Sequence, residues 1–138
     1  MKNKSWKEKL LIEKKPIVKR IEKGFSDILA HATMLIATPK IVDDYIKKIP
    51  KGTFLSTSTI RKDLAAQFNA DYTCPLTTGI FIRIVAEAAY EAYLNGMDID
   101  AITPFWRVIA PGSAMAKKVS FGEKFITNQR KNEEVRNK

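Results

Sequence analysis

Few residues of this sequence could take part in covalent chemistry. It contains one cysteine, Cys74, and one histidine, His31. A thiol becomes a nucleophile when a base or a helix N-terminus lowers its pKa, and Cys74 directly precedes Pro75 and a predicted helix. No histidine is near it in the sequence, so we expect a small buried side chain, with a nucleophilic Cys74 as the less favoured alternative. A single cysteine excludes an intrachain disulfide, and no Cys/His spacing predicts a metal site or a cofactor.

The segment 102–112, ITPFWRVIAPG, combines aromatic and basic residues that could bind a flat, anionic partner. We expect a strand over 101–110, in which neighbouring side chains alternate between faces, so that Phe105 or Trp106 faces the core. The other aromatic could stack on a base. Arg107 either contacts phosphate or forms a structural salt bridge, and the residues leave both roles open.

The charge of the chain also indicates an anionic partner. The net charge is +9, and residues 1–24 carry nine Lys or Arg and three Glu, so this segment alone contributes +6. Nucleic acid is the leading candidate, although the basic segment could equally be a solvated face. No apolar run is long enough to span a bilayer and no secretory leader is evident, so we expect a cytoplasmic protein with no membrane partner.

The elements that must position these residues follow from the apolar pattern. Residues 1–33 are predicted to be a basic helical extension, interrupted by Pro16 and ended by Gly24, whose apolar side chains dock on the body. The body, 34–138, begins with a short apolar segment. Thr38 and Pro39 then predict the cap and first residue of a helix that ends near Pro50.

A second and a third helix follow in the predicted body. Ile60, Leu64, Ala65 and Phe68 share one face of the second helix, whereas Arg61 and Lys62 point elsewhere. The third helix is the longest. Thr77 or Thr78 is expected to cap it, and Asn95–Gly96 to end it. Arg83 and Glu87 lie on its polar side. Its other side is covered by two apolar stripes: Ile80, Ile84, Ala88 and Ala92, and Phe81, Val85 and Ala89.

A last amphipathic helix is predicted around Phe125 and Ile126. Two helices with a short connection, followed by an extended element, have the order of a winged helix. The predicted fold class is therefore α+β, mainly helical: a winged helix-turn-helix domain with an N-terminal helical extension.

The order of several segments resembles a known family. The run MLIATPKIVDDYIKKIPKG, IRKDLAAQF, TTGIFIRIVAEAA, TPFWRVI and FGEKFITNQ is similar to the DNA-binding domain of the methylated-DNA–protein-cysteine methyltransferases. It resembles still more the alkyltransferase-like proteins, which have that fold without the transfer activity. The resemblance covers about residues 34–135. The family motif Pro-Cys-His-Arg-Val matches Pro104–Val108, with Phe105 in place of the cysteine and Trp106 in place of the histidine.

The resemblance implies a set of site residues. A base pocket is expected at Pro104, Phe105 and Trp106, and the DNA-binding residues are expected to be Thr77, Thr78, Arg83, Arg61, Lys62 and Arg107. The family has an arginine early in the recognition helix, a place that falls near Thr77–Gly79 here. Arg83 comes later in the helix, where it could reach the DNA groove or pair with Glu87 at i+4.

These residues predict binding without the transfer reaction. Phenylalanine has no lone pair, so residue 105 cannot accept an alkyl group. We expect a non-enzymatic protein that binds double-stranded DNA, recognises alkylated guanine by base flipping, and passes it to a repair protein. The alternatives are a winged-helix module that binds undamaged DNA or a protein partner, and an enzyme that uses Cys74.

Overall fold

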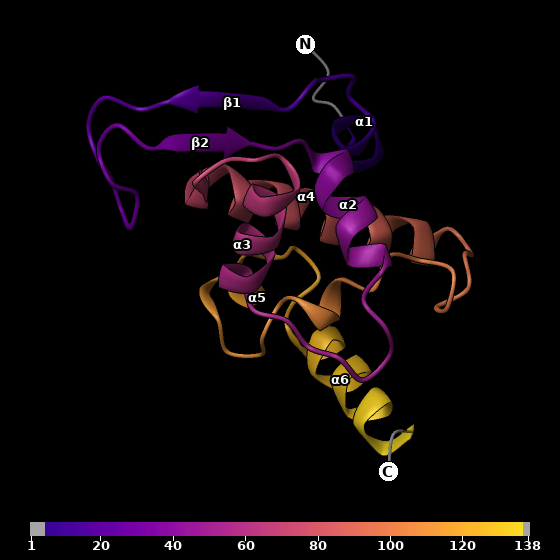
Figure 1. Cartoon of the computed structure of the whole chain (residues 1–138). Helices are drawn as coiled ribbons and strands as arrows, with labels where there is room; N and C mark the ends of the chain where they lie inside the picture. Colours follow the sequence, from indigo (N-terminus) through magenta and orange to yellow (C-terminus); the bar gives the residue numbers. More distant parts are fainter. Residues whose placement is uncertain (1–4, 137–138) are drawn as a thin grey trace.

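The computed structural model describes residues 5–136, with side chains described up to Glu134, so Lys2 and Lys4 of the predicted basic extension lie outside the described residues. The fold is α+β: about half of the residues are helical and three short strands form one sheet (Figure 1). The helices are α1 (Trp6–Leu10), α2 (Pro39–Lys47), α3 (Thr57–Gln67), α4 (Pro75–Leu94), the 3₁₀ turn η1 (Phe105–Arg107), α5 (Ala114–Lys118) and α6 (Lys124–Arg136).

The sheet contains β1 (Ile17–Arg20), β2 (Thr33–Ile36) and β3 (Tyr72–Thr73), in that order. β1 pairs antiparallel with β2, and β2 pairs parallel with β3. The expectation of helix beyond Pro16 was therefore wrong. A strand forms there because β2 supplies a hydrogen-bonding partner, an interaction that local periodicity does not reveal. The expected boundary between residues 33 and 34 falls inside β2.

The short helix α1 docks on the body, as its apolar residues predicted. A capping box closes its N-terminus: the Ser5 hydroxyl accepts from the Glu8 amide, and the Glu8 carboxylate accepts from the Ser5 amide. Such a box satisfies two amides that the helix itself leaves unpaired. α1 contacts α4 and α2, and Leu10 packs against the main core.

α2 and α3 begin where their capping residues predict. The Thr38 hydroxyl accepts from the Ile41 amide with Pro39 next in the chain, and the Ser56 hydroxyl accepts from the Thr59 amide. Both helices turn an apolar face inward. The buried apolar residues are Val42 and Ile46 of α2 and Ile60, Leu64 and Ala65 of α3.

The longest helix, α4, starts earlier than predicted. Its N-cap is Cys74, and neither Thr77 nor Thr78 caps it. Instead the Thr78 hydroxyl is buried and donates to the Cys74 carbonyl at 2.6 Å. The predicted stripe was also partly wrong, because Ile80 is 50% exposed while Ile82, Val85, Ala86 and Ala89 face the core. The helix ends at Asn95–Gly96 as predicted, with Gly96 in the left-handed region (φ +104°) that favours glycine.

The segment 101–110 is not a strand. It contains the 3₁₀ turn η1, in which the amides of Val108 and Ile109 both donate to the Phe105 carbonyl. The sheet therefore precedes α4 in the described chain. α5 was not predicted, whereas α6 confirms a last helix around Phe125 and Ile126, with Ile126 fully buried.

No helix among the described residues is both long enough and apolar enough to cross a bilayer.

Candidate nucleic-acid interface

The predicted base pocket is part of the core. Phe105 is 0% exposed, Trp106 is 4% exposed, and Pro104 is buried. The ring of Phe105 lies 5.3 Å from that of Trp106, 5.4 Å from Phe121 and 5.8 Å from Phe125, distances typical of packed aromatic pairs. The prediction that at least one of the two aromatics faces the core is confirmed. Both do so, because a 3₁₀ turn does not alternate side chains between two faces as the expected strand would. A base could stack on Phe105 only after the core opened.

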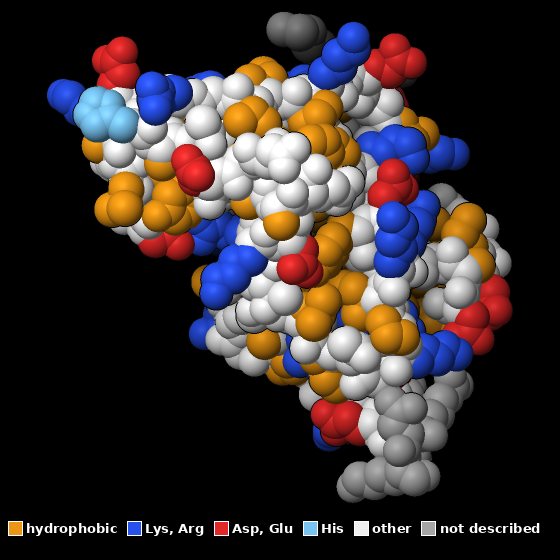
Figure 2. All heavy atoms as spheres, viewed as in Figure 1, with side chains coloured by type: hydrophobic (Ala, Val, Ile, Leu, Met, Phe, Trp, Pro, Cys, Tyr) orange, Lys and Arg blue, Asp and Glu red, His pale blue; other side chains and the backbone are white. Residues whose placement is uncertain are grey.

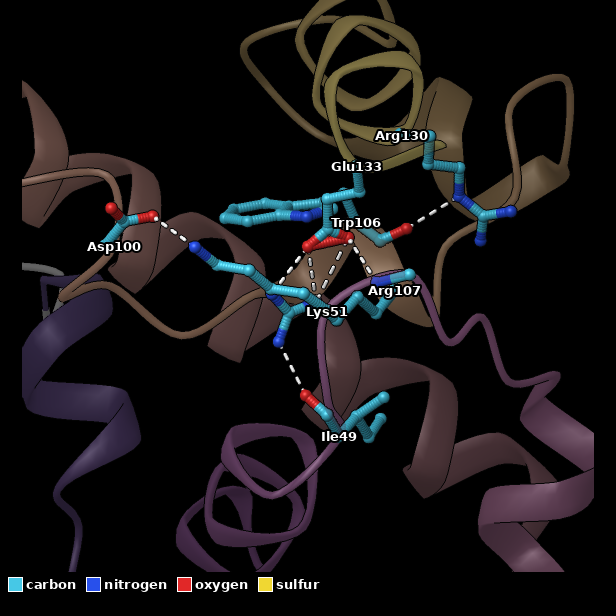
Figure 3. Close-up of polar contacts among 8 residues, drawn as sticks. Ile49, Lys51, Asp100, Trp106, Arg107, Arg130 and Glu133 are labelled. Atoms are coloured by element: carbon cyan, nitrogen blue, oxygen red, sulfur yellow. Dashed lines mark hydrogen bonds and ion pairs between the residues drawn. The ribbon is translucent and has the colours of Figure 1, made fainter. Parts of the chain in front are cut away.

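Arg107 is also buried, and its donors are occupied inside the protein (Figure 3). The Nε of Arg107 donates to Glu133 Oε1 at 2.7 Å, and Nη2 lies 2.5 Å from the same oxygen. Nη1 donates to the Ile49 carbonyl at 2.5 Å. Of the two roles left open by the sequence, the structure shows the salt bridge. Arg107 is 7% exposed, so little of its guanidinium lies at the surface.

The ion pair fastens α6 to the turn that carries the aromatic residues. Burial acts to raise the pKa of the Glu133 carboxyl, but the polar groups around it, with the Arg107 guanidinium first among them, outweigh burial and hold the pKa below its usual value. Arg130, one turn before Glu133, donates to the Trp106 carbonyl at 2.6 Å (Figure 3). Two contacts from α6 thus fix η1.

The two basic residues of α3 have different surroundings. The Arg61 guanidinium donates to both carboxylate oxygens of Asp27, at 2.8 and 2.9 Å, and its Nε donates to the Thr73 carbonyl at 3.0 Å. The hydrogen bond from Arg61 lowers the pKa of Asp27 below its usual value. Arg61 therefore ties the β1–β2 hairpin to α3, whereas Lys62 is exposed.

The start of α4 holds three of the predicted DNA-binding residues. Thr78 is buried and bonded within its own helix, and the Thr77 hydroxyl is buried without a hydrogen-bond partner. Arg83 Nε lies 3.5 Å from Glu87 Oε2, and its guanidinium stacks over the Trp6 ring at 5.4 Å. Glu87 was expected on an outer face but is 2% exposed, with its carboxylate accepting from the Ser120 amide and hydroxyl.

Cys74 lies at the junction of β3 and α4. It is 5% exposed, and its amide donates to the Leu35 carbonyl at 2.8 Å, so it is held as part of the core. His31 is exposed on the β1–β2 hairpin. Across the described residues, no three His, Cys, Asp or Glu side chains are grouped in a way that could hold a metal ion.

Besides a small hollow of about 200 Å³ lined by Arg61 and Lys62, two larger hollows are lined by predicted site residues. One, of about 390 Å³, is lined by Pro104, Trp106 and Arg107 together with lysines of the α2 end. The other, of about 430 Å³, is lined by the first turns of α4 together with α1 and α5. We call the second the α4 groove and define it by Trp6, Lys9, Leu76, Ile80, Arg83, Met115 and Lys118.

Basic side chains are spread over the surface, and the β1–β2 hairpin carries Lys19, Arg20 and Lys23 together with Glu22 and Asp27. In Figure 2 the end of the molecule that carries His31 also shows Lys and Arg side chains and exposed apolar side chains. All four residues of β1 are exposed, including Lys19 and Arg20. Of the basic residues in 1–24, the hairpin holds only Lys19, Arg20 and Lys23, whereas Lys7 and Lys9 belong to α1.

Several residues that matter for the site carried no sequence signal. Glu133 and Asp27 neutralise Arg107 and Arg61 from distant parts of the chain, and sequence spacing alone does not pair them. Trp6 and Met115, which line the α4 groove, come from segments predicted only as an extension and a loop. The i+4 spacing of Arg83 and Glu87 gave their pairing as one of two open roles, and the structure shows the pair.

Comparison of the chain with protein-family models, with curated proteins and with solved structures gives no significant match.

Proposed function

We propose that the chain is a non-enzymatic protein that binds double-stranded DNA. In this proposal α3 and α4 form a helix-turn-helix pair, and the β1–β2 hairpin takes the part of a wing, with the cytoplasm as the location. The observation that carries it is the tie between hairpin and helix: Arg61 of α3 holds Asp27 of the hairpin with two hydrogen bonds. Lys19, Arg20 and Lys23 of the hairpin are thereby held beside the helix pair. A fixed basic surface is what a phosphate backbone selects.

Two further features support the proposal. The Cys74 cap gives α4 no side-chain hydrogen bond, so the amides of its first turn have no side-chain acceptor from the cap. Helix N-termini of this kind bind phosphate oxygens. The net charge of +9 adds a long-range attraction that speeds association with DNA.

The narrower proposal is recognition of alkylated guanine by base flipping, followed by transfer of the lesion to a repair protein. Its support is the resemblance at Pro104–Val108 and the hollow of about 390 Å³ beside Pro104 and Trp106. The burial of Phe105 and Trp106 favours the second candidate, a module that binds undamaged DNA with no preference for lesions. A nucleophile is missing at residue 105, and Cys74 is enclosed, so neither candidate is an enzyme.

The test is a titration of labelled duplexes, with and without an alkylated guanine, at two salt concentrations. We expect binding whose affinity falls steeply with salt, because each neutralised phosphate releases counterions. Lys19→Glu and Lys62→Glu should weaken binding to every sequence and reduce the salt slope by about one each. The matched control is Lys131→Glu on α6, at the other end of the molecule from the hairpin (Figure 1).

Three results would change the proposal. Equal affinity for both duplexes removes the lesion part and leaves the undamaged-DNA module. Added alkyl mass on Cys74, detected by mass spectrometry of the protein after incubation, would show an enzyme. Absence of salt-dependent binding to either duplex would reject DNA as the partner.

A further inference from the structure

The α4 groove has a composition that the DNA-binding proposal does not use. Its apolar lining comes from three separate elements: Trp6 of α1, Leu76 and Ile80 of α4, and Met115 of α5. Leu76 is 69% exposed and Ile80 is 50% exposed, one turn apart on the same helix. Apolar side chains gathered in a groove, as opposed to scattered singly, mark a binding surface.

The charges around this groove have one sign. Lys9, Arg83 and Lys118 line it, and no Asp or Glu is among the described residues that do so. At the side of Trp6, the Lys9 ammonium lies 4.3 Å from the centre of the ring. The groove is therefore complementary to a ligand that is apolar in the middle and anionic at its edges.

Arg83 has hydrogen-bonding capacity that its neighbours do not fill. Its Nε is buried and has no hydrogen-bond partner of good geometry, although Glu87 Oε2 is 3.5 Å away. The Glu87 carboxylate is directed to Ser120, which donates from its amide at 2.8 Å and from its hydroxyl at 2.5 Å. The Nε is enclosed, but the Arg83 side chain as a whole is 39% exposed, so an incoming carboxylate could pair with its terminal nitrogens.

We propose that the α4 groove binds an acidic, amphipathic segment of a partner protein. An apolar anchor of that segment packs on Leu76, Ile80 and Met115, while its carboxylates pair with Arg83 and Lys118. A helix with apolar residues on one face and acids beside them has this chemistry. Methionine suits such a surface because its flexible side chain adapts to the anchor.

The apolar lining favours a protein segment over duplex DNA. Removing the exposed parts of Leu76 and Ile80 from water is favourable by about 25 cal/mol for each Å² covered by apolar atoms. A phosphate backbone has no comparable apolar surface to cover them with. The inference gives the chemistry of the partner protein and stands whether or not the hairpin binds DNA.

The experiment uses a labelled synthetic peptide helix with leucines on one face and glutamates on both flanks. A second peptide replaces every glutamate by glutamine, and a third replaces every leucine by alanine. Binding of each to the full chain is followed by fluorescence anisotropy, and amide chemical shifts locate it. We expect the first peptide to bind, with shifts at α4's first turns and α5, and each of the other two to bind at least several-fold more weakly.

Matched variants separate the groove from the rest of the surface. Ile80→Asp should weaken binding of the peptide roughly tenfold, about 1.4 kcal/mol. Leu94→Asp, at a position 66% exposed at the far end of α4, should have little effect. Lys118→Glu should weaken binding, and Lys117→Glu, its neighbour outside the groove, should not. Gly79→Leu places a side chain into the groove, where a Cβ would meet only the Met115 methyl at 3.4 Å, and should block the peptide without unfolding the helix.

Three outcomes would overturn the inference. The first is no binding of the acidic peptide up to millimolar concentration. The second is equal binding of the glutamine peptide, which would remove the charge argument. The third is a result in which duplex DNA, and not the peptide, shifts the amide resonances of the α4 groove, and in which Lys118→Glu lowers the affinity for DNA. The DNA proposal is tested separately, by the effect of Lys19→Glu and Lys62→Glu on duplex binding. Failure of one proposal can therefore be told from failure of the other.

Discussion

Arg107 and Glu133 form a buried ion pair that joins the 3₁₀ turn η1 to α6 across 26 residues of sequence. Both side chains are almost fully enclosed, and the pair is completed by the Ile49 carbonyl, which accepts from Arg107. Buried charges are stable only when their partners are present. This relationship, and not a contact with DNA, explains the arginine in the segment ITPFWRVIAPG.

Removing one member of this pair should destabilise the fold strongly. We expect Arg107→Met to lower the free energy of unfolding by about 3–5 kcal/mol, because Glu133 is left buried without its counter-ion. The double variant Arg107→Met, Glu133→Met should recover much of the loss. Urea denaturation measures both. Unchanged stability in Arg107→Met, together with weaker DNA binding, would mean that Arg107 acts at an interface.

The same pair should make stability depend on pH. The pKa of Glu133 is lower in the folded chain than its usual value of 4.5, so the ion pair stabilises fully above that value and loses its contribution as the pH falls through the folded pKa. Glu133→Gln should therefore be less stable than the wild type at neutral pH, and the difference should shrink in acid. Melting temperatures across this range measure it. A difference that is constant with pH would contradict the assignment.

Phe105 should behave as a core residue. Phe105→Ala should cost about 3–5 kcal/mol of stability, as large-to-small changes in aromatic cores do, and Phe105→Leu clearly less. Near-ultraviolet circular dichroism should report loss of order in the cluster with Phe121 and Phe125. If a base does stack on Phe105, the leucine variant would instead keep its stability and lose preference for the lesion.

The tie between Asp27 and Arg61 should control the motion of the hairpin. Asp27→Asn removes the charge that Arg61 holds, so we expect faster hydrogen exchange at the amides of Phe25 and Ile28, which pair across the hairpin tip. Global stability should change little because Asp27 is mostly exposed. Asp98→Asn, at another exposed aspartate, is the control. Equal exchange in both variants would show that the tie is not what holds the hairpin.

Cys74 should be protected in the folded chain. It is 5% exposed, so we expect slow reaction with a thiol reagent in native buffer and rapid reaction in denaturant. Cys74→Ala should retain both the fold and any DNA binding. Rapid labelling of the native chain would reopen a reactive role for the thiol.

Local signals predicted the helices of the body well. Thr38 with Pro39 marks the start of α2, and Asn95–Gly96 marks the end of α4, because capping chemistry acts within one turn of the chain. The start of α4 was misplaced by three to four residues because Pro75 begins it without a side-chain cap, while the threonines that follow lie inside the helix.

Contacts between distant segments accounted for most of what the sequence did not predict. Ile17 and Val18 are strand residues because they pair with Ile36 and Leu35, far along the chain. The apolar segment around Phe105 fits a strand and a buried turn equally well, and only the absence of a neighbouring strand decides between them. The partners of Arg61 and Arg107 depend on the same long-range geometry. Most residues of the expected site therefore lie in the core or in ion pairs.

The enclosure of Arg107 and Glu133 has a consequence for how the sequence can diverge. A substitution at either position alone gives a poorly folded variant, because one buried charge is left without its partner. A joint substitution by two apolar residues leaves no unpaired charge. In descendants of a common ancestor the two positions should therefore vary together. A relative with neither charge would have kept the fold, and a relative with only one should carry a new counter-ion nearby.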